Sequence, residues 1–254
     1  MKYLQLLLAG VLGCAAVPAL AAANTLFCGE LANTFGPFDF RDSANAANLQ
    51  LVETAHFTSN VERGEHGNSG TLGQELFYTL RAFPNHPRAL ATMSKVALRD
   101  NLVQIPDMRY PVECYFDRAL RFTPDDPQVR AMFGQYLFAR GQSERALGFL
   151  EQAAKLDPAS GPVQYNLGIA YFKMKRYADA NLAAQRAYAL QFPLPGLRRM
   201  LTEAGQWHPE AAPAAAAGAA DTAPATTAAP PASGPAVPGN QASPPAATDA
   251  GRQP

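Results

Sequence analysis

The chain has 254 residues and carries 21 Lys and Arg residues against 21 Asp and Glu residues, so its formal net charge at pH 7 is zero. This balance argues against a nucleic-acid partner, because affinity for phosphate backbones depends on clustered positive charge. The sequence also contains no nucleophile elbow, phosphate-binding glycine loop or dinucleotide-binding motif. We therefore predict a protein that is not an enzyme and needs no cofactor.

The first 23 residues have the pattern of a secretory signal peptide. Lys2 precedes an apolar run, and small residues offer a cleavage site near Ala21 or Ala23. The apolar run is too short, and too soon followed by Pro18, for a transmembrane helix. We predict a cleaved signal peptide at 1–23, a periplasmic location and no membrane span in the mature chain.

Cys14 supports a different interpretation of the same segment. Residues 11–14, Val-Leu-Gly-Cys, are similar to a lipoprotein processing site, which would make Cys14 a lipid-bearing N-terminus. Val11 stands where Leu is usual, and a conventional cleavage site follows. The alternative to a free periplasmic protein is therefore a membrane-anchored envelope lipoprotein with a structural role.

Two cysteines, Cys28 and Cys114, remain after cleavage at Ala23. In an oxidising compartment a single pair can form a disulfide. Closing a loop of about 85 residues would stabilise the fold by roughly 3–5 kcal/mol. We predict this disulfide; the alternative is a buried Cys114 and a free Cys28.

Residues 24–71 carry no repeat and are predicted to be largely irregular, with a short helix at 44–55. Phe35, Phe38 and Phe40 fall within six residues and need a packing partner. We expect them to cover the end of the helical region that follows, and an aromatic recognition patch is the alternative.

The same segment gathers five acidic and imidazole side chains. A metal-binding or catalytic module is conceivable there, because carboxylates and imidazoles serve both roles. No metal-ligand spacing is met, so solvated or hydrogen-bonded polar groups are the simpler interpretation. The five residues are Glu53, His56, Glu62, Glu65 and His66.

Helical periodicity begins at Leu72 and continues to Phe83. Pro87 then opens a second helical pattern, and a third runs over 111–122. The intervening 101–110 is about six residues longer than the corresponding turns further along and contains Pro106. Such an insertion maps to a loop on one face of a repeat protein.

Residues 127–194 contain the same pattern twice, 34 residues apart. Each copy predicts two helices, over 128–140 and 143–156 and then over 162–174 and 177–190. Gly134 and Ala146, and equally Gly168 and Ala180, fall where the two helices of a pair would cross. Small residues at such crossings let helix axes approach closely. The apolar face of the second copy includes Leu182.

The chain ends with one further predicted helix over 195–207 and an Ala/Pro-rich tail over 209–254. The helix combines an apolar stripe with a charged face, as a terminal cap requires. The tail has too few large apolar residues to offset the entropy of ordering it, so we predict disorder.

A period of 34 with Gly134 and Gly168, Ala146 and Ala180, and Asp157-Pro158 resembles the tetratricopeptide repeat. The resemblance implies an all-α solenoid of about three helical hairpins at 87–126, 127–160 and 161–194. Capping helices flank them, giving a helical array over 72–208. The chain is similar to exported bacterial members of undefined role.

Members of this family bind proteins or peptides in a groove lined by the first helix of each pair. Carried over to this chain, the resemblance implies a groove formed by Arg88, Lys95, Arg99, Gln128, Gln135, Phe138, Tyr165, Ile169, Phe172 and Lys173. The Lys and Asn pairing that captures C-terminal carboxylates in some members is not met. The resulting prediction is a periplasmic adaptor that binds a protein or peptide of the cell envelope.

Overall fold

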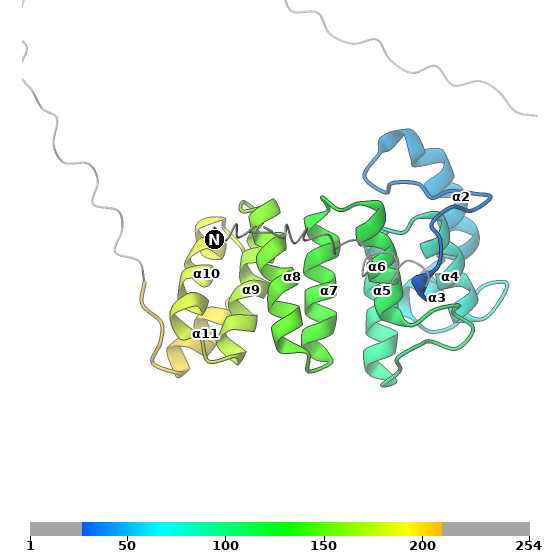
Figure 1. Cartoon of the computed structure of the whole chain (residues 1–254). Coiled ribbons are helices and arrows are strands. Elements are labelled where there is room, and N and C mark those ends of the chain that lie inside the picture. Colours follow the sequence, from blue (N-terminus) through cyan, green and yellow to red (C-terminus); the bar gives the residue numbers. More distant parts are fainter. Residues whose placement is uncertain (1–26, 210–254) are drawn as a thin grey trace, which may run out of the picture. The chain divides into compact units, whose positions relative to one another are not determined.

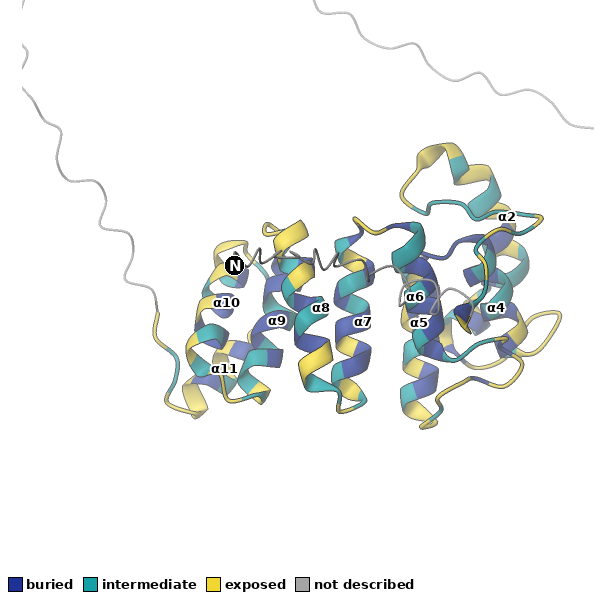
Figure 2. Ribbon diagram, viewed as in Figure 1, coloured by how far each residue is buried: buried dark blue, intermediate teal, exposed yellow. Residues whose placement is uncertain are grey.

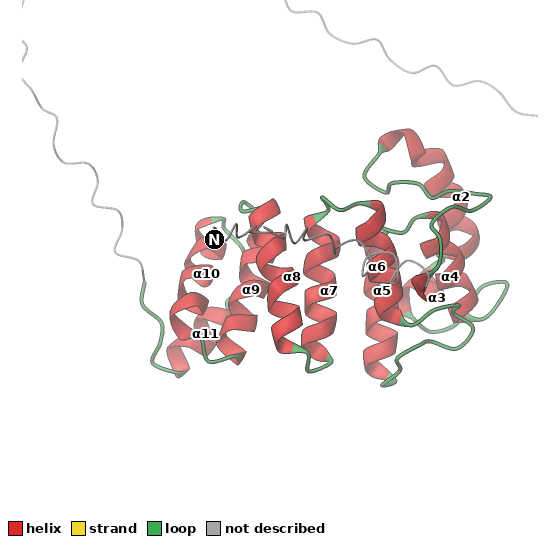
Figure 3. Ribbon diagram, in the orientation of Figure 1, coloured by secondary structure: helices red, strands yellow, loops and turns green. Residues whose placement is uncertain are grey.

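The computed structural model describes residues 27–209, and every regular element in that range is a helix (Figure 3). The predicted signal peptide, Cys14 and residues 210–254 of the predicted tail lie outside the described residues. In chain order the elements are η1 (Ser43–Asn45), α2 (Ala46–His56), α3 (Ser59–Arg63), α4 (Leu72–Ala82), α5 (Pro87–Arg99), α6 (Val112–Phe122), α7 (Pro127–Ala139), α8 (Ser143–Leu156), α9 (Gly161–Lys173), α10 (Tyr177–Ala189) and α11 (Gly196–Glu203).

Helices α7 and α8, and likewise α9 and α10, form tightly packed hairpins that stand side by side (Figure 1). A Cβ added at Gly134 would lie 2.7 Å from Leu150 Cγ and 3.0 Å from the Ala146 carbonyl oxygen. Ala146 and Ala180 are fully buried. The small residues therefore set the close approach of each pair, as predicted, and the four helix ranges agree with the predicted ones to within one residue.

Each first helix begins in the same way, with a polar cap followed by proline in the first turn. The Asp126 carboxylate accepts hydrogen bonds from the backbone N–H groups of the first turn of α7, and the Ser160 hydroxyl accepts one in α9. His86 occupies the corresponding position before α5, and its Nδ1 accepts from Ala89 N at 3.2 Å.

The α5–α6 pair packs less closely than the two hairpins that follow. Ser94 and Val112 stand where the later pairs have Gly and Ala, so the crossing is wider. The long connection at 101–110 fills space beside it, with Ile105 and Met108 buried in the core formed by α4–α7. This insertion is thus partly a packing element.

The N-terminal segment, predicted to be largely irregular, contains η1, α2 and the short helix α3. The helix predicted at 44–55 corresponds to α2, whereas α3 was not predicted. Phe35, Phe38 and Phe40 pack against Phe83 at the end of α4 and against Val52 of α2. The aromatic residues therefore cover the start of the helical array, as expected.

At the other end, α11 buries Leu197 and Leu201 against α9 and α10, so it closes the stack as a terminal cap (Figure 2). It ends at Glu203, earlier than predicted. The prediction for Leu182 was wrong: it is 47% exposed, because it lies on the outer side of α10. Within residues 27–209, none of the helices has the length and apolar character needed to cross a bilayer.

Candidate protein-binding site

The predicted groove residues of α5 contact the chain's own N-terminal segment. Arg88 forms ion pairs with Glu53 of α2 and Glu62 of α3. Lys95 Nζ donates to the Arg63 carbonyl at 3.2 Å, and Arg99 Nη1 donates to the Gly64 carbonyl at 3.0 Å.

Between those cations, Thr92 Oγ1 donates to the Glu62 carbonyl at 2.8 Å. A Cβ on Gly64 would lie 2.6 Å from Val96 Cγ2. Helix α3 and Gly64 therefore cover this stripe of α5. The three cations that were predicted to bind a partner contact the chain's own N-terminal segment instead.

The first-helix face is open between α7 and α9. Two hollows lie there, of about 400 Å³ and 180 Å³, and they adjoin each other at Gln135 and Asn166, which line both. The structure brings five of the predicted groove residues to these hollows: Gln128, Gln135, Phe138, Ile169 and Lys173.

The two ends of this α7–α9 groove differ in charge. Arg41, Asp126 and Asp157 line the larger hollow, and Arg41 is paired with Asp39 and Asp125. Lys173 lies at the smaller hollow, with its Nζ 5.4 Å from the centroid of the Phe138 ring. The floor is mixed aromatic, aliphatic and amide, which suits a peptide more than a small charged ligand.

Tyr165 and Phe172 contribute to packing. The Tyr165 ring lies 4.8 Å from that of Phe192, and Phe172 lies 5.4 Å from Tyr177 in an edge-to-face arrangement. Both pack against the apolar cluster that holds α11 in place. Neither residue lines the α7–α9 groove, so we do not include them in the binding surface.

Asn166 and Arg41 were missed by sequence reasoning. Asn166 lies three residues before Ile169 on the same helix face, so helical periodicity offered a signal for it. Arg41 lies in the non-repeating segment and reaches the groove only through the fold.

The five acidic and imidazole residues of the N-terminal segment do not converge on one site. Within residues 27–209 no three His, Cys, Asp or Glu side chains are arranged to hold a metal. Glu53 binds His86 and Arg88, Glu65 pairs with Arg63, and His66 contacts the Gly67 carbonyl.

His56 bonds to the buried carboxylate of Glu75, with Nδ1 2.7 Å from Oε2. The other carboxylate oxygen accepts from the backbone N–H groups of Asn68, Ser69 and Gly70. Burial alone would raise the pKa of Glu75, but hydrogen bonds from His56 and from the loop lower this pKa to about 2. The carboxylate thus fixes the loop before α4, which is a structural role.

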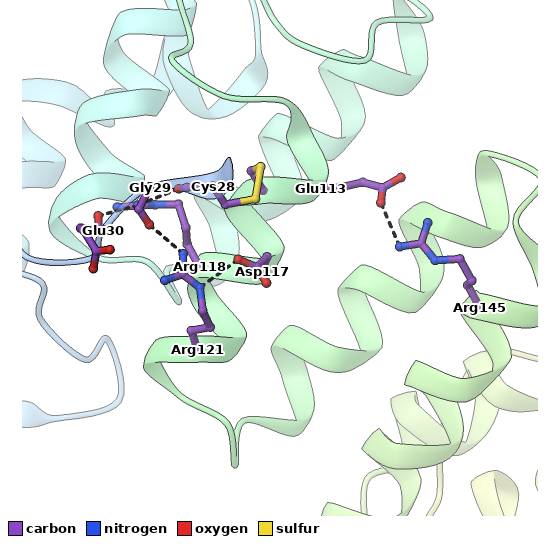
Figure 4. The surroundings of a disulfide bond; sticks show 9 residues. Cys28, Gly29, Glu30, Glu113, Asp117, Arg118, Arg121 and Arg145 are labelled. Atoms are coloured by element: carbon purple, nitrogen blue, oxygen red, sulfur yellow. Dashed lines mark hydrogen bonds and ion pairs between the residues drawn. A yellow bond between two sulfur atoms is a disulfide. The ribbon is translucent and has the colours of Figure 1, made fainter. Parts of the chain in front are cut away.

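The predicted disulfide is present: Cys28 and Cys114 are bonded, with Cα atoms 5.0 Å apart and 86 residues apart in sequence (Figure 4). One turn after Cys114, the buried Arg118 donates to the carbonyls of Cys28, Gly29 and Glu30 at 3.1, 3.3 and 2.8 Å. Because the bond and the guanidinium act on adjacent residues, they anchor the N-terminal segment to α6.

Part of the chain matches a known protein family. The family model described as tetratricopeptide repeat matches residues 137–187. Among solved structures, PilF of Pseudomonas aeruginosa is 22% identical, with 65% of this chain and 71% of that chain covered and a TM-score of 0.45. MamA MSR-1 is 17% identical (59% and 80% covered, TM-score 0.38), and MamA AMB-1 is 14% identical (65% and 91%, TM-score 0.41).

No curated protein matches the chain. The family match lies over α8, α9 and most of α10, the part in which the 34-residue period, the Gly and Ala crossings and the paired helices coincide. Residues 137–187 therefore match the tetratricopeptide repeat, and the hairpins α7–α8 and α9–α10 form an all-helical scaffold of the kind that this repeat provides for protein interactions.

Proposed function

We propose that this protein is a periplasmic adaptor that holds a segment of an envelope protein in the α7–α9 groove. The observation that carries the proposal is that two adjacent hollows share the side-chain amides of Gln135 and Asn166. Side-chain amides both donate and accept, so they can bind the backbone of a peptide in either polarity. Phe138 and Ile169 supply an apolar contact at the smaller hollow, and Lys173 favours an acidic group there.

This surface is narrower than the one that the family resemblance implied. The N-terminal segment already covers α5, so a partner engages the second and third repeats. The signal-peptide pattern and the Cys28–Cys114 disulfide support export to an oxidising compartment. The mass of the mature N-terminus distinguishes cleavage near Ala23 from lipid attachment at Cys14.

In-cell photo-crosslinking tests the groove directly. A photoreactive residue at Gln135 is expected to give a discrete adduct, whereas the same residue at Glu203, exposed on α11, is expected to give none. Equal adducts from both positions, or none from Gln135, would contradict the proposal.

A paired set of variants tests the chemistry. Lys173→Glu combined with Asn166→Ala is expected to abolish the Gln135 adduct while the helical circular dichroism signal is unchanged. Arg199→Glu makes the same charge change on the exposed side of α11 and serves as the control. An adduct that persists in the double variant would exclude this groove.

A further inference from the structure

The second helices of the repeats form another surface, on which the chain already binds a short turn of its own backbone. Residues 28–30 lie against α6, and their three carbonyls converge on one nitrogen of Arg118 where Gly29 has a φ of 71° (Figure 4). Arg121 Nη2 adds a bond to the Gly29 carbonyl at 2.9 Å, and Asn33 Nδ2 donates to the Arg81 carbonyl at the end of α4. This turn of the backbone is thus held to α6 by the Cys28–Cys114 disulfide and by cations that donate to its carbonyls.

Each of the last two second helices keeps one of these two cations in register, whereas Gln152 of α8 and Ala189 of α10 stand at the other position. Arg186 of α10 lies 68 residues, or two periods, after Arg118, and Lys155 of α8 lies 34 residues after Arg121. Arg186 and Lys155 are both exposed, and they line one hollow of about 650 Å³ between α8 and α10. Leu167 and Tyr171 of α9 lie at its floor.

Two polar groups complete this α8–α10 hollow. Gln164 is only 2% exposed; its Nε2 donates to the Pro158 carbonyl, and its buried Oε1 accepts no hydrogen bond from the described residues. Glu151, the carboxylate in the hollow, accepts from the Tyr171 hydroxyl at 2.8 Å and lies 3.9 Å from Arg176. Because Glu151 contacts Tyr171 and Arg176, Arg186 and Lys155 can donate hydrogen bonds to the acceptor groups of a ligand.

We propose that the α8–α10 hollow binds a segment of a partner protein whose successive carbonyls turn toward one side, as those of residues 28–30 do at α6, with Arg186 and Lys155 donating to these carbonyls. Such a partner presents a turn free of Lys and Arg, because positive charge would be repelled by both cations. The surface is separate from the α7–α9 groove, so the adaptor would hold two segments on opposite helix rows.

The experiment uses the full mature, disulfide-bonded chain, in which the α6 site is already filled. The probe is a synthetic, N-acetylated and C-amidated peptide of residues 27–34 carrying Cys28→Ser, titrated into isotope-labelled protein and followed by NMR. Chemical-shift changes are expected in α8, α10 and the facing side of α9.

Arg186→Ala with Lys155→Ala is expected to weaken peptide binding about tenfold or more, since each charge-assisted bond contributes more than a neutral one. Arg199→Ala removes one charge from α11 and is expected to leave binding unchanged. Shifts confined to the α7–α9 groove, no shifts at millimolar peptide, or equal binding by the double variant would each overturn this inference. None of these outcomes decides the crosslinking test at Gln135, so the two proposals fail separately.

Discussion

Glycine at the helix crossings gives the sharpest test of how the repeats pack. Gly134→Ala places a methyl group 2.7 Å from Leu150 Cγ and 3.0 Å from the Ala146 carbonyl, and the latter belongs to the backbone of α8 and cannot rotate away. Gly148→Ala, within α8, places the same methyl group where nothing lies within 4 Å. The two variants therefore make the same chemical change and gain the same helix propensity, but the added methyl group overlaps its neighbours at Gly134 and meets none at Gly148.

The magnitudes follow from these two contributions. Replacing Gly by Ala inside a helix favours the folded state by about 0.8–1.0 kcal/mol. Overpacking a well-filled contact costs about 1–3 kcal/mol. We expect Gly148→Ala to raise the free energy of unfolding by somewhat under 1 kcal/mol, and Gly134→Ala to lower it by about 1 kcal/mol. At Gly168 the nearest atom is the end of the Leu197 side chain, which can move, so Gly168→Ala should be less costly than Gly134→Ala.

Urea unfolding followed by circular dichroism measures all three variants against the unmodified chain. The predicted order of stability is Gly148→Ala, unmodified chain, then Gly134→Ala. A difference of about 2 kcal/mol between the extreme variants corresponds to a melting-temperature difference of roughly 4–8 °C for a chain of this size. If Gly134→Ala were stabilised as much as Gly148→Ala, the argument that glycine sets the α7–α8 distance would be refuted.

Three further predictions concern the N-terminal half. Burial lowers the pKa of His86, despite its bond to Glu53, so the folded state binds fewer protons than the unfolded state. The contribution of His86 to the free energy of unfolding should therefore be complete above pH 6.5 and decrease as the pH falls below that value. The variant His86→Asn can still cap α5, and its urea midpoint should change less with pH over that range. The pKa of Glu75 is lowered to about 2, so its contribution to the free energy of unfolding is present above pH 4.5 and is lost as the pH falls toward 2. Glu75→Gln should lower the free energy of unfolding at pH 7 by about 1–3 kcal/mol. A urea midpoint equal to that of the unmodified chain would contradict the role of the carboxylate in fixing the loop. Reduction of Cys28–Cys114 should destabilise the chain by about 3–5 kcal/mol, measured as a lower melting temperature with reductant, whereas the Cys28→Ser variant should show no response to reductant.

Much of the architecture could be predicted because its determinants are local and periodic. The 34-residue spacing of Gly134 and Gly168 identified the crossings, and capping residues and prolines located the helix starts. The disulfide followed from simple counting, since only two cysteines remain beyond the predicted leader. The crossings and helix starts depend on neighbours within about one repeat, so the sequence pattern carries them, whereas the disulfide joins residues 86 apart and was predicted from the cysteine count alone.

The candidate site was only partly predictable. Gln135, Phe138 and Lys173 line the α7–α9 groove because helical register dictates which side they face. Arg88, Lys95 and Arg99 have the same register but contact α2, α3 and Gly64. Register predicts a face, and it does not predict whether another part of the chain covers that face.

By itself, the sequence determined the helix pairs, their order and the residues at their crossings. The tertiary structure alone decided which stripes stay open, because the covering N-terminal segment has no repeat and binds through long-range contacts. Arg118 shows the difference most clearly: its position on α6 is periodic, but its burial beneath the carbonyls of residues 28–30 depends on a segment almost 90 residues away. Non-local contacts of an aperiodic segment leave no spacing in the sequence, so only the folded chain reveals them.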